Sequence, residues 1–453
     1  MRRPNLRLSA GALAMAAALA ASAGAVAPHV YAITGARIVP VSGAPIAAGT
    51  IVVRNGLIEA VGANVQAPAG AQVIDGKGLT VYPGLIDMAN STGLDIEITR
   101  QMPQSINTTE AAERWKRDLI LKPAVSAADH LQEAPELARL ASVGITSVLS
   151  TPPGVFVKGR SGLVNVAPPV DEPAIGNVGD YRSGIQVVRT PVALHIEFPG
   201  GVGGAGYPNS LLGVISFVRQ TFLDAQHQQV LAQRAAKNAA MRPAYDPALD
   251  ALQPALDGQL PVAFEVNSSR EIMRALAMAQ EFKLDPVISG AREADLVAGD
   301  LKARNARVIY NLNYPTRSRA LAPDADEPVE VLRTRANAPK VPAALEKAGL
   351  TFAFSAAGIR EPRDFVRNAA RAVREGLSAD AALRALTLDA AKIAGADNRV
   401  GSIDKGKIAN LVITDGDLFE DDTQIKHVFV GGQMIVLQPP QPQRGGGRGR
   451  GGM

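Results

Sequence analysis

The alternation of hydrophobic and polar residues near the N-terminus predicts short strands joined by tight turns. Runs rich in β-branched residues are typical of strands. The runs with this character are Tyr31–Val41, Thr50–Val53, Leu57–Val61, Ala71–Asp75 and Leu79–Tyr82. Asn55-Gly56 separates two of them and suits the positive φ angles of a hairpin turn. Gly76-Lys77-Gly78 separates another two, so the sequence predicts a second unit of the same kind.

From about Pro83 to Ala394 the pattern changes, and helical periodicity alternates with short apolar runs. The helical segments are Ala134–Ser142, Ser210–Gln228, Ser269–Phe282 and Asp364–Glu375. The apolar runs are Ile145–Leu149, Val192–Phe198, Val262–Val266, Pro286–Ser289, Arg307–Tyr310 and Thr351–Phe354. These runs are too short for helices and are typical of buried parallel strands. Regular alternation over this length indicates a parallel sheet with crossover helices, of which a closed barrel is the commonest large form.

The last part of the chain returns to strand character. Asn410–Thr414, His427–Val430 and Met434–Leu437 are predicted strands. Residues 438–453 consist almost entirely of Pro, Gln, Arg and Gly. Because they lack the apolar residues that offset the entropy of ordering, we expect this tail to be disordered.

The first residues have the layout of a secretory signal peptide. Three arginines precede the apolar, Ala-rich run Ala10–Ala25, and Ala25-Val26-Ala27 offers a small-x-small cleavage site. We therefore expect an exported protein, periplasmic or secreted, with no membrane span after cleavage. Residues 1–27 hold three arginines and no acidic residue, so 44 of the 47 basic residues remain against 43 acidic ones. This balance indicates no nucleic-acid partner, and the absence of cysteine excludes thiol chemistry.

Two segments at opposite ends of the predicted barrel resemble the amidohydrolase superfamily. The entry segment runs from Asn55-Gly56-Leu57-Ile58 to Pro83-Gly84-Leu85-Ile86-Asp87. The exit segment runs from Ala385-Leu386-Thr387 through Val400-Gly401-Ser402 to Ala409-Asn410-Leu411-Val412. Between them, Gly144–Val148 and Ala275–Phe282 look most like the imidazolonepropionase-like branch.

The resemblance implies a fold and a domain order. The fold is an α/β (β/α)8 TIM-type barrel with a small β-sandwich domain formed by the N- and C-terminal segments. The implied order is a signal peptide at 1–27, a β-domain shared by 28–82 and 395–437, the barrel at 83–394 and the tail at 438–453. In this family, one or two metal ions at the carboxyl ends of the strands lower the pKa of a bound water.

The positions where the resemblance places metal ligands carry other residues here. A His-x-His pair follows the first barrel strand in the family, one residue beyond the position of Asp87, but the sequence continues Met88-Ala89-Asn90-Ser91. A methyl group cannot bind a metal, and a serine hydroxyl is a poor substitute for imidazole. The residues at the family's ligand positions are Ala89, Ser91, His195, Glu265, Ser289 and Ala357. The sequence therefore predicts that the usual metal centre is missing, and no cofactor is expected.

A different site at the barrel mouth remains open. Its candidate residues are His195 and Glu265 for catalysis, and Glu197, Asn267 and Arg292 for binding. His195 and Glu265 could hold a single divalent metal, since imidazole and carboxylate suit several such ions. They could also be ordinary polar residues at strand ends.

Two hypotheses about function follow. The first is a non-catalytic homologue that acts as a binding or partner subunit, in a homo-oligomer or with an intact amidohydrolase paralogue. The second is a hydrolase of amide, lactam or dipeptide C–N bonds with an altered or single-metal site. The two hypotheses differ in whether metal-dependent turnover is observed.

Overall fold

A computed structural model describes residues 30–97, 102–166, 180–182, 185–199, 208–237, 244–322, 324–435 and 437. The predicted signal peptide and the predicted disordered tail lie outside the described residues. Within them, no helix has the length and hydrophobicity needed to cross a membrane.

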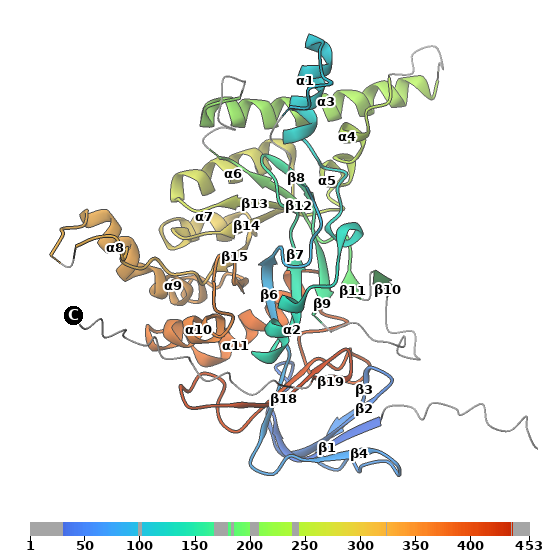
Figure 1. Cartoon of the computed structure of the whole chain (residues 1–453), viewed down its shortest axis with the longest axis vertical. Coiled ribbons are helices and arrows are strands. Elements are labelled where there is room, and N and C mark those ends of the chain that lie inside the picture. The colour runs from blue at the N-terminus through green and yellow to red at the C-terminus, as the bar shows by residue number, and fades with distance from the viewer. Residues whose placement is uncertain are drawn as a thin grey trace, which may run out of the picture.

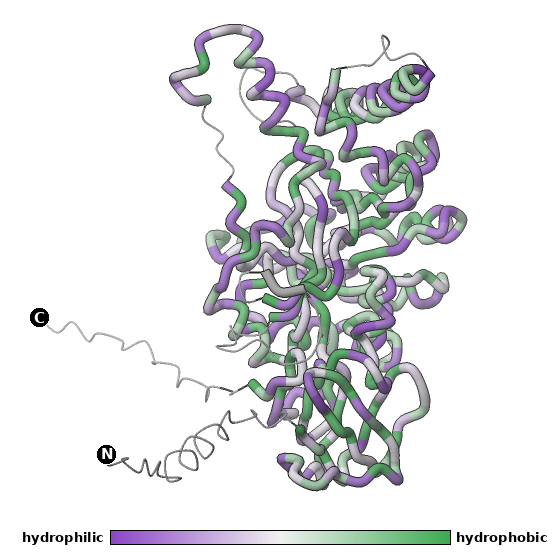
Figure 2. Tube along the Cα trace, turned by 90° about the vertical axis from the view of Figure 1, so that its right-hand side faces the viewer, coloured by the Kyte–Doolittle hydropathy of each residue, from purple (hydrophilic) through white to green (hydrophobic). Residues whose placement is uncertain are grey.

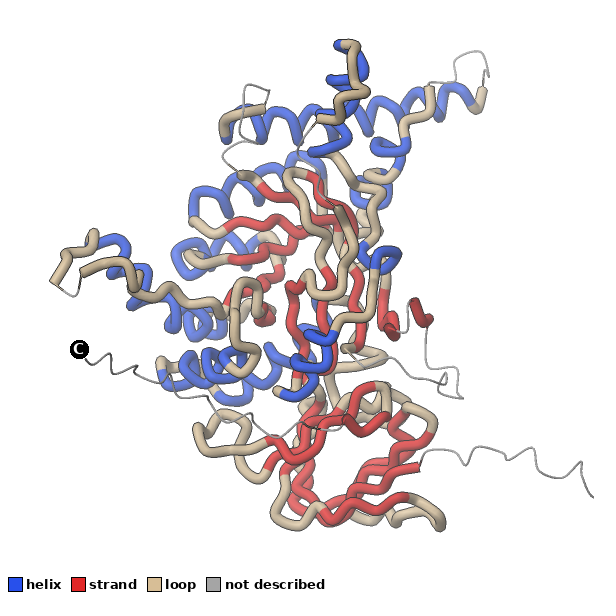
Figure 3. The backbone as a smooth tube through the Cα atoms, in the orientation of Figure 1, coloured by secondary structure: helices blue, strands red, loops and turns tan. Residues whose placement is uncertain are grey.

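The N-terminal and C-terminal segments build one sheet together. Its strands are β1 (Val30–Ile38), β2 (Ile46–Arg54), β3 (Leu57–Gly62), β4 (Gln72–Asp75), β5 (Thr80–Pro83), β17 (Leu411–Thr414), β18 (Ile425–Val430) and β19 (Gln433–Ile435). Pairing joins all eight into the order β19-β18-β17-β5-β1-β2-β3, with β4 beside β1. The sheet bends around a buried core that includes Ile33, Ile51, Ile413 and Phe429 (Figure 3).

One of the two predicted hairpins is confirmed. Asn55 and Gly56 have φ angles of 50° and 82° and join the antiparallel strands β2 and β3. The second prediction is wrong, because β4 and β5 do not pair with each other. Both run parallel to β1, one after the other, and pair with successive parts of it. The turn between them is also hydrogen-bonded to β1, because the Gly76 N–H donates to Thr34 O at 2.8 Å.

The middle of the chain forms two further sheets. One has the order β10-β11-β9-β7-β6 and the other the order β16-β15-β14-β13-β12-β8. Their strands are β6 (Leu85–Asn90), β7 (Ile145–Ser150), β8 (Val157–Arg160), β9 (Gly162–Asn165), β10 (Asp180–Arg182), β11 (Ile185–Arg189), β12 (Leu194–Glu197), β13 (Val262–Val266), β14 (Pro286–Gly290), β15 (Arg307–Asn311) and β16 (Phe352–Ser355). Strands β12 to β16 are parallel, as predicted from their apolar runs.

The antiparallel segment formed by β8 and β9 was not predicted. These strands are separated only by Ser161, and they run antiparallel to β12 and β7 respectively. Ser161 donates its N–H to Ala193 O, and Val192 donates to Ser161 O. One continuous stretch of chain therefore bridges the two sheets.

Helices cover the outer faces of these sheets (Figure 1). They are α1 (Thr109–Ile120), η1 (Ala127–His130), α2 (Pro135–Ser142), α3 (Leu211–Ala235), α4 (Pro247–Asp250), α5 (Gln253–Leu256), α6 (Ser269–Phe282), η3 (Ala294–Val297), α7 (Ala298–Ala303), α8 (Val329–Asn337), η4 (Ala338–Lys340), α9 (Val341–Lys347), α10 (Asp364–Arg374), α11 (Ala379–Leu386) and α12 (Leu388–Ile393). All four helical segments predicted from the sequence are present. Hydrophobic and hydrophilic residues alternate along the peripheral helices (Figure 2), as expected for helices with one buried face.

A second apolar core lies on the opposite faces of the central strands. Strands β6, β7, β9, β11, β13, β14, β15 and β16 each contribute side chains to it. Ala193, the residue before β12, also belongs to it. Its strand residues are Ile86, Met88, Leu149, Leu163, Val188, Ala263, Val287, Ile309 and Ala353. Neighbouring residues such as Leu194, Phe264 and Tyr310 face the helices instead. The two-residue period of each strand therefore separates an inner core from an outer one.

The strand pairing leaves the two central sheets as open sheets, so it does not by itself give the closed (β/α)8 barrel that was predicted. The fold is nevertheless a mixed α/β fold with a parallel sheet. A side-chain contact joins the first and last central strands, because the Asp87 carboxylate on β6 accepts the N–H of Ala356, directly after β16, at 2.7 Å.

A buried polar cluster connects the terminal sheet to the central strands. Asn410 precedes β17 and donates to Asn165 Oδ1 at 2.8 Å and to Ser147 Oγ at 3.1 Å. It also accepts the Gly431 N–H at 2.8 Å, while Asn165 donates to Gln186 Oε1 at 2.6 Å. All four side chains are buried. Removing one member would leave buried polar groups of the others without one of their partners.

We predict that Asn410→Ala lowers the free energy of unfolding by about 1–3 kcal/mol, the cost of leaving buried polar groups unsatisfied. Urea denaturation of both proteins measures the difference. Asn398→Ala, at an exposed position, is the matched control and should change stability by less than about 0.5 kcal/mol. Equal losses in the two variants would contradict the role of the cluster.

Candidate ligand-binding cavity

A cavity of about 460 Å³ lies where the central parallel strands end. Eight of the residues singled out from the sequence line it: Ala89, Ser91, Glu197, Glu265, Asn267, Ser289, Arg292 and Ala357. They come from the carboxyl ends of β6, β12, β13, β14 and β16 or from the residues directly after these strands. The structure therefore brings together side chains that lie up to 268 positions apart in the sequence, from Ala89 to Ala357.

Strand register explains why these polar side chains meet. Glu197 pairs with Glu265, and Glu265 pairs with Ser289, on three neighbouring strands. Ala263 and Val287 lie two residues earlier on their strands and belong to the inner core. Since side chains two residues apart share a face, Glu265 and Ser289 point to the same interior, one layer nearer the carboxyl ends.

Lys158 on β8 is the central charge of the cavity, and the sequence analysis missed it. Its Nζ lies 2.6 Å from Oε2 of Glu265 and 3.3 Å from Oε2 of Glu197. The side chain is 10% exposed, so the ammonium is held between two carboxylates almost out of solvent. The available signal was a lone lysine in the apolar stretch Val155–Gly159.

The charges in this cluster stabilise one another. Burial lowers the pKa of Lys158, but the carboxylates of Glu265 and Glu197 outweigh burial and raise it above its usual value. Burial likewise raises the pKa of Glu265, and the hydrogen bond from His195 and the charge of Lys158 reverse this effect and lower it to about 2. At neutral pH the cluster therefore contains an ammonium ion and an ionised Glu265.

His195 does not line the cavity but lies behind Glu265. Its Nδ1 is 3.0 Å from Oε1 of Glu265, and the side chain is only 1% exposed. Because Glu265 is ionised, Nδ1 carries the hydrogen and donates it to the carboxylate. Nε2 is buried and has no hydrogen-bond partner among the described residues. His195 therefore orients Glu265, and its other nitrogen is closed to solvent.

Asp87 forms the buried base of the site next to the cavity. It accepts hydrogen bonds from Ala89 N, Asn90 Nδ2 and Ala356 N, at 3.2, 2.9 and 2.7 Å. Burial raises the pKa of Asp87 to about 6, although these hydrogen bonds act in the opposite direction. In the sequence, Asp87 only fixes the position of the expected His-x-His pair. Its place at the end of an apolar strand was the signal that it would be buried.

Comparison with known proteins finds a family match over part of the chain. The family described as "Amidohydrolase family" matches residues 278–435. No curated protein matches the chain.

Solved structures of amidohydrolases share the fold. An amidohydrolase from Thermotoga maritima MSB8 is 22% identical and has a TM-score of 0.70, with 90% of this chain and 99% of that chain covered. A Xaa-Pro dipeptidase with bound methionine in the active site is 16% identical, with a TM-score of 0.53 and 89% and 99% covered. A prolidase complexed with N-methylphosphonate-L-proline is 17% identical, with a TM-score of 0.53 and 90% and 100% covered.

The metal chemistry implied by this amidohydrolase fold does not fit the residues of the cavity. Both carboxylate oxygens of Glu265 are already engaged, Oε1 by His195 and Oε2 by Lys158. The Lys158 ammonium also contacts Glu197, so a positive charge already occupies the space between the two carboxylates. A divalent ion at the same place would be repelled by this ammonium.

The raised pKa of Asp87 predicts how stability depends on pH. Since its folded pKa of about 6 exceeds the usual 3.8, the contribution of Asp87 is fully present below pH 3.8 and is lost as the pH rises through 6. The loss amounts to about 3 kcal/mol, from a shift of about two units. In Asp87→Asn this part of the pH dependence should disappear.

Urea denaturation of the wild type and Asp87→Asn at several pH values between 4 and 7.5 tests this prediction. Asp397→Asn, at an exposed position, controls for the removal of one acidic group. Parallel stability curves for the wild type and Asp87→Asn would show that Asp87 is not responsible.

Proposed function

We propose that this chain is an exported amidohydrolase-family protein that binds a ligand in its central cavity and does not carry out metal-dependent hydrolysis. The observation that carries the proposal is the Lys158 ammonium between Glu197 and Glu265. Export rests on the signal-peptide pattern of residues 1–27. The imidazolonepropionase-like branch remains a prediction from the sequence.

The proposal includes a closed barrel with a sandwich-like terminal domain. Two observations support closure: the inner core that draws side chains from strands of both central sheets, and the Asp87–Ala356 hydrogen bond between the first and last strands. In such a barrel, the carboxyl ends of the strands form the ligand-binding end. The cavity has this position.

The Lys158 cluster supports a binding role because it satisfies the site's charges internally. Glu265 and Lys158 neutralise each other, and Glu197 keeps a side chain that is 36% exposed in the cavity. Glu197 can therefore accept hydrogen bonds from a ligand, as can the hydroxyl of Ser289 beside Glu265. These groups hold and orient a polar ligand without activating a water molecule.

The alternative is a hydrolase of amide, lactam or dipeptide C–N bonds with an altered site. It is favoured by the contact between His195 and Glu265 and by the prolidase and dipeptidase among the structures of the same fold. Two features oppose it. A carboxyl group with a pKa of about 2 is a weak general base at neutral pH, and Nε2 of His195 is closed to solvent.

We predict that purified wild-type protein contains far less than one divalent metal ion per chain, whereas Lys158→Ala binds close to one zinc ion. Removing the ammonium frees the carboxylates of Glu197 and Glu265 as ligands, and two neighbouring carboxylates without their cation favour a replacement. Elemental mass spectrometry after dialysis against zinc measures the metal content. Zinc should also raise the melting temperature of Lys158→Ala, since ligand binding stabilises the folded state.

The control is Lys347→Ala, which removes an exposed lysine far from the cavity in sequence and should behave like the wild type. Stoichiometric metal in wild-type protein purified without chelator would overturn the proposal. So would metal-dependent turnover of a panel of amides, lactams and dipeptides by the wild type.

A further inference from the structure

Helix α8 belongs to an arm that projects from the central strands (Figure 1). The arm begins after the carboxyl end of β15, a strand whose last residue, Asn311, lines the cavity. It returns to the central strands through η4 and α9. Its return is anchored, since the hydroxyl of buried Tyr310 donates to Ala338 O at 2.6 Å. None of the nine residues of α8 is buried.

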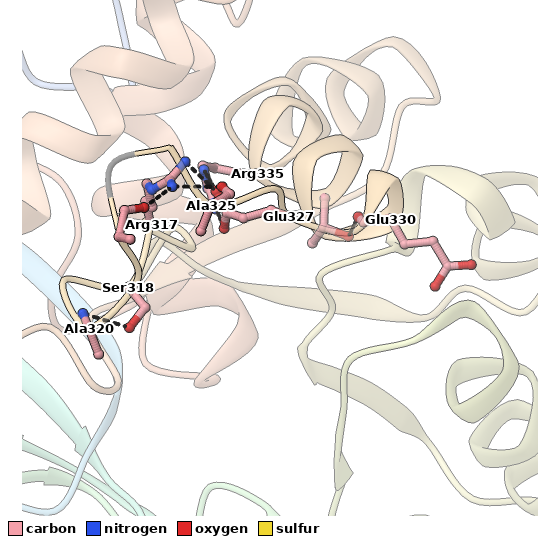
Figure 4. Close-up of polar contacts among 9 residues, drawn as sticks. Arg317, Ser318, Ala320, Ala325, Glu327, Glu330 and Arg335 are labelled. Carbon is pink, nitrogen blue, oxygen red and sulfur yellow. Dashed lines mark hydrogen bonds and ion pairs between the residues drawn. The ribbon is translucent and has the colours of Figure 1, made fainter.

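The shape of the arm is fixed by an ion-pair cluster around Glu327, whose side chain is 5% exposed (Figure 4). Glu327 pairs with Arg335 on α8 and, at 3.4 Å, with Arg317 on the opposite side of the loop. Arg317 also donates to the carbonyl oxygens of Ala322 and Ala325, both at 2.8 Å. The cluster therefore holds the loop against the last turn of α8.

The arm exposes several large apolar side chains. Four of its large hydrophobic side chains are more than 40% exposed: Leu321, Val329, Val331 and Leu332. On α8, Val329, Leu332 and Ala336 have the spacing i, i+3, i+7, which places them in one stripe along the helix. An apolar stripe that is exposed to water, on a helix held in place by ion pairs, is typical of an interaction surface.

The length of α8 strengthens this conclusion. A helix of nine residues is only marginally stable in water without tertiary packing. The ion pair of Arg335 holds its last turn, but no residue of its apolar stripe is buried. A partner that covers the stripe would supply the missing stabilisation.

Charges beside the stripe indicate which partner fits. Glu330 and Arg333 lie on one flank of the stripe, and neither side chain forms an ion pair with any described residue. Figure 4 shows the Glu330 side chain directed away from the Glu327 cluster. In an antiparallel pair of identical helices the same flank of each helix meets, so Glu330 of one copy faces Arg333 of the other. Leu332 then meets its own counterpart near the two-fold axis.

We propose that α8 is the self-complementary contact of a homodimer, in which two copies of this chain pair their α8 helices antiparallel about a two-fold axis. Isologous contacts of this kind are the commonest way in which identical chains associate. The small size of the surface predicts a weak, concentration-dependent dimer.

Sedimentation velocity of the full chain over a concentration series up to about 100 µM tests the proposal, since small interfaces give weak complexes. We expect the wild type to dimerise and Leu332→Glu to be monomeric throughout. Leu223→Glu is the matched control, because Leu223 is a similarly exposed leucine on α3, and it should dimerise like the wild type. A monomeric wild type, or a Leu332→Glu variant that still dimerises, would overturn the proposal.

Exchanging the charges of Glu330 and Arg333 distinguishes the antiparallel homodimer from the binding of another partner to the same surface. Glu330→Arg and Arg333→Glu should each raise the dissociation constant by about tenfold or more, because each sets like charges against each other. The double variant Glu330→Arg/Arg333→Glu restores opposite charges across the axis and should return to within a few-fold of the wild type. Failure of the double variant to recover would contradict the antiparallel two-fold arrangement.

Discussion

The two-residue period of the central strands determines where both the core and the cavity lie. One set of side chains packs under the helices, and the alternate set packs against the neighbouring strands in the interior. Toward the carboxyl ends the inward positions become polar, and Glu265 and Ser289 follow Ala263 and Val287 on the same face. A shift of register by one residue would bury the charged side chains under the helices and expose the apolar ones. The cavity and the inner core therefore depend on the same register.

The charges inside this cavity are paired with one another by side chains of the chain itself. Two carboxylates near one another repel when both ionise, and a cation between them removes this repulsion. In this chain the cation is the Lys158 ammonium, delivered by the antiparallel strand that bridges the two central sheets. A lysine is covalently fixed and has no open coordination position. It can neutralise the carboxylates, but it cannot bind a water molecule and lower its pKa as a metal does.

The stretch of chain that forms β8 and β9 also connects the central strands to the terminal sheet. Its second half, β9, carries Asn165, which joins Asn410 before β17 and Ser147 on β7 in a buried polar cluster. Such a cluster is satisfied only when all its members are in place. The same stretch of chain thus carries Lys158 into the cavity and Asn165 into the contact with the terminal sheet.

The sequence by itself determined most of the elements and their order, because periodicity, turn residues and local motifs are encoded in neighbouring residues. It also identified eight residues that line the cavity, since the carboxyl ends of parallel strands meet at one edge. Tertiary structure alone decided that β4 and β5 both follow β1, because the alternation pattern of a strand does not name its partner. It also decided that Lys158 lies between Glu197 and Glu265, and that His195 is behind them. Those contacts join residues 39 to 107 positions apart, and only the folded register brings them within hydrogen-bonding distance.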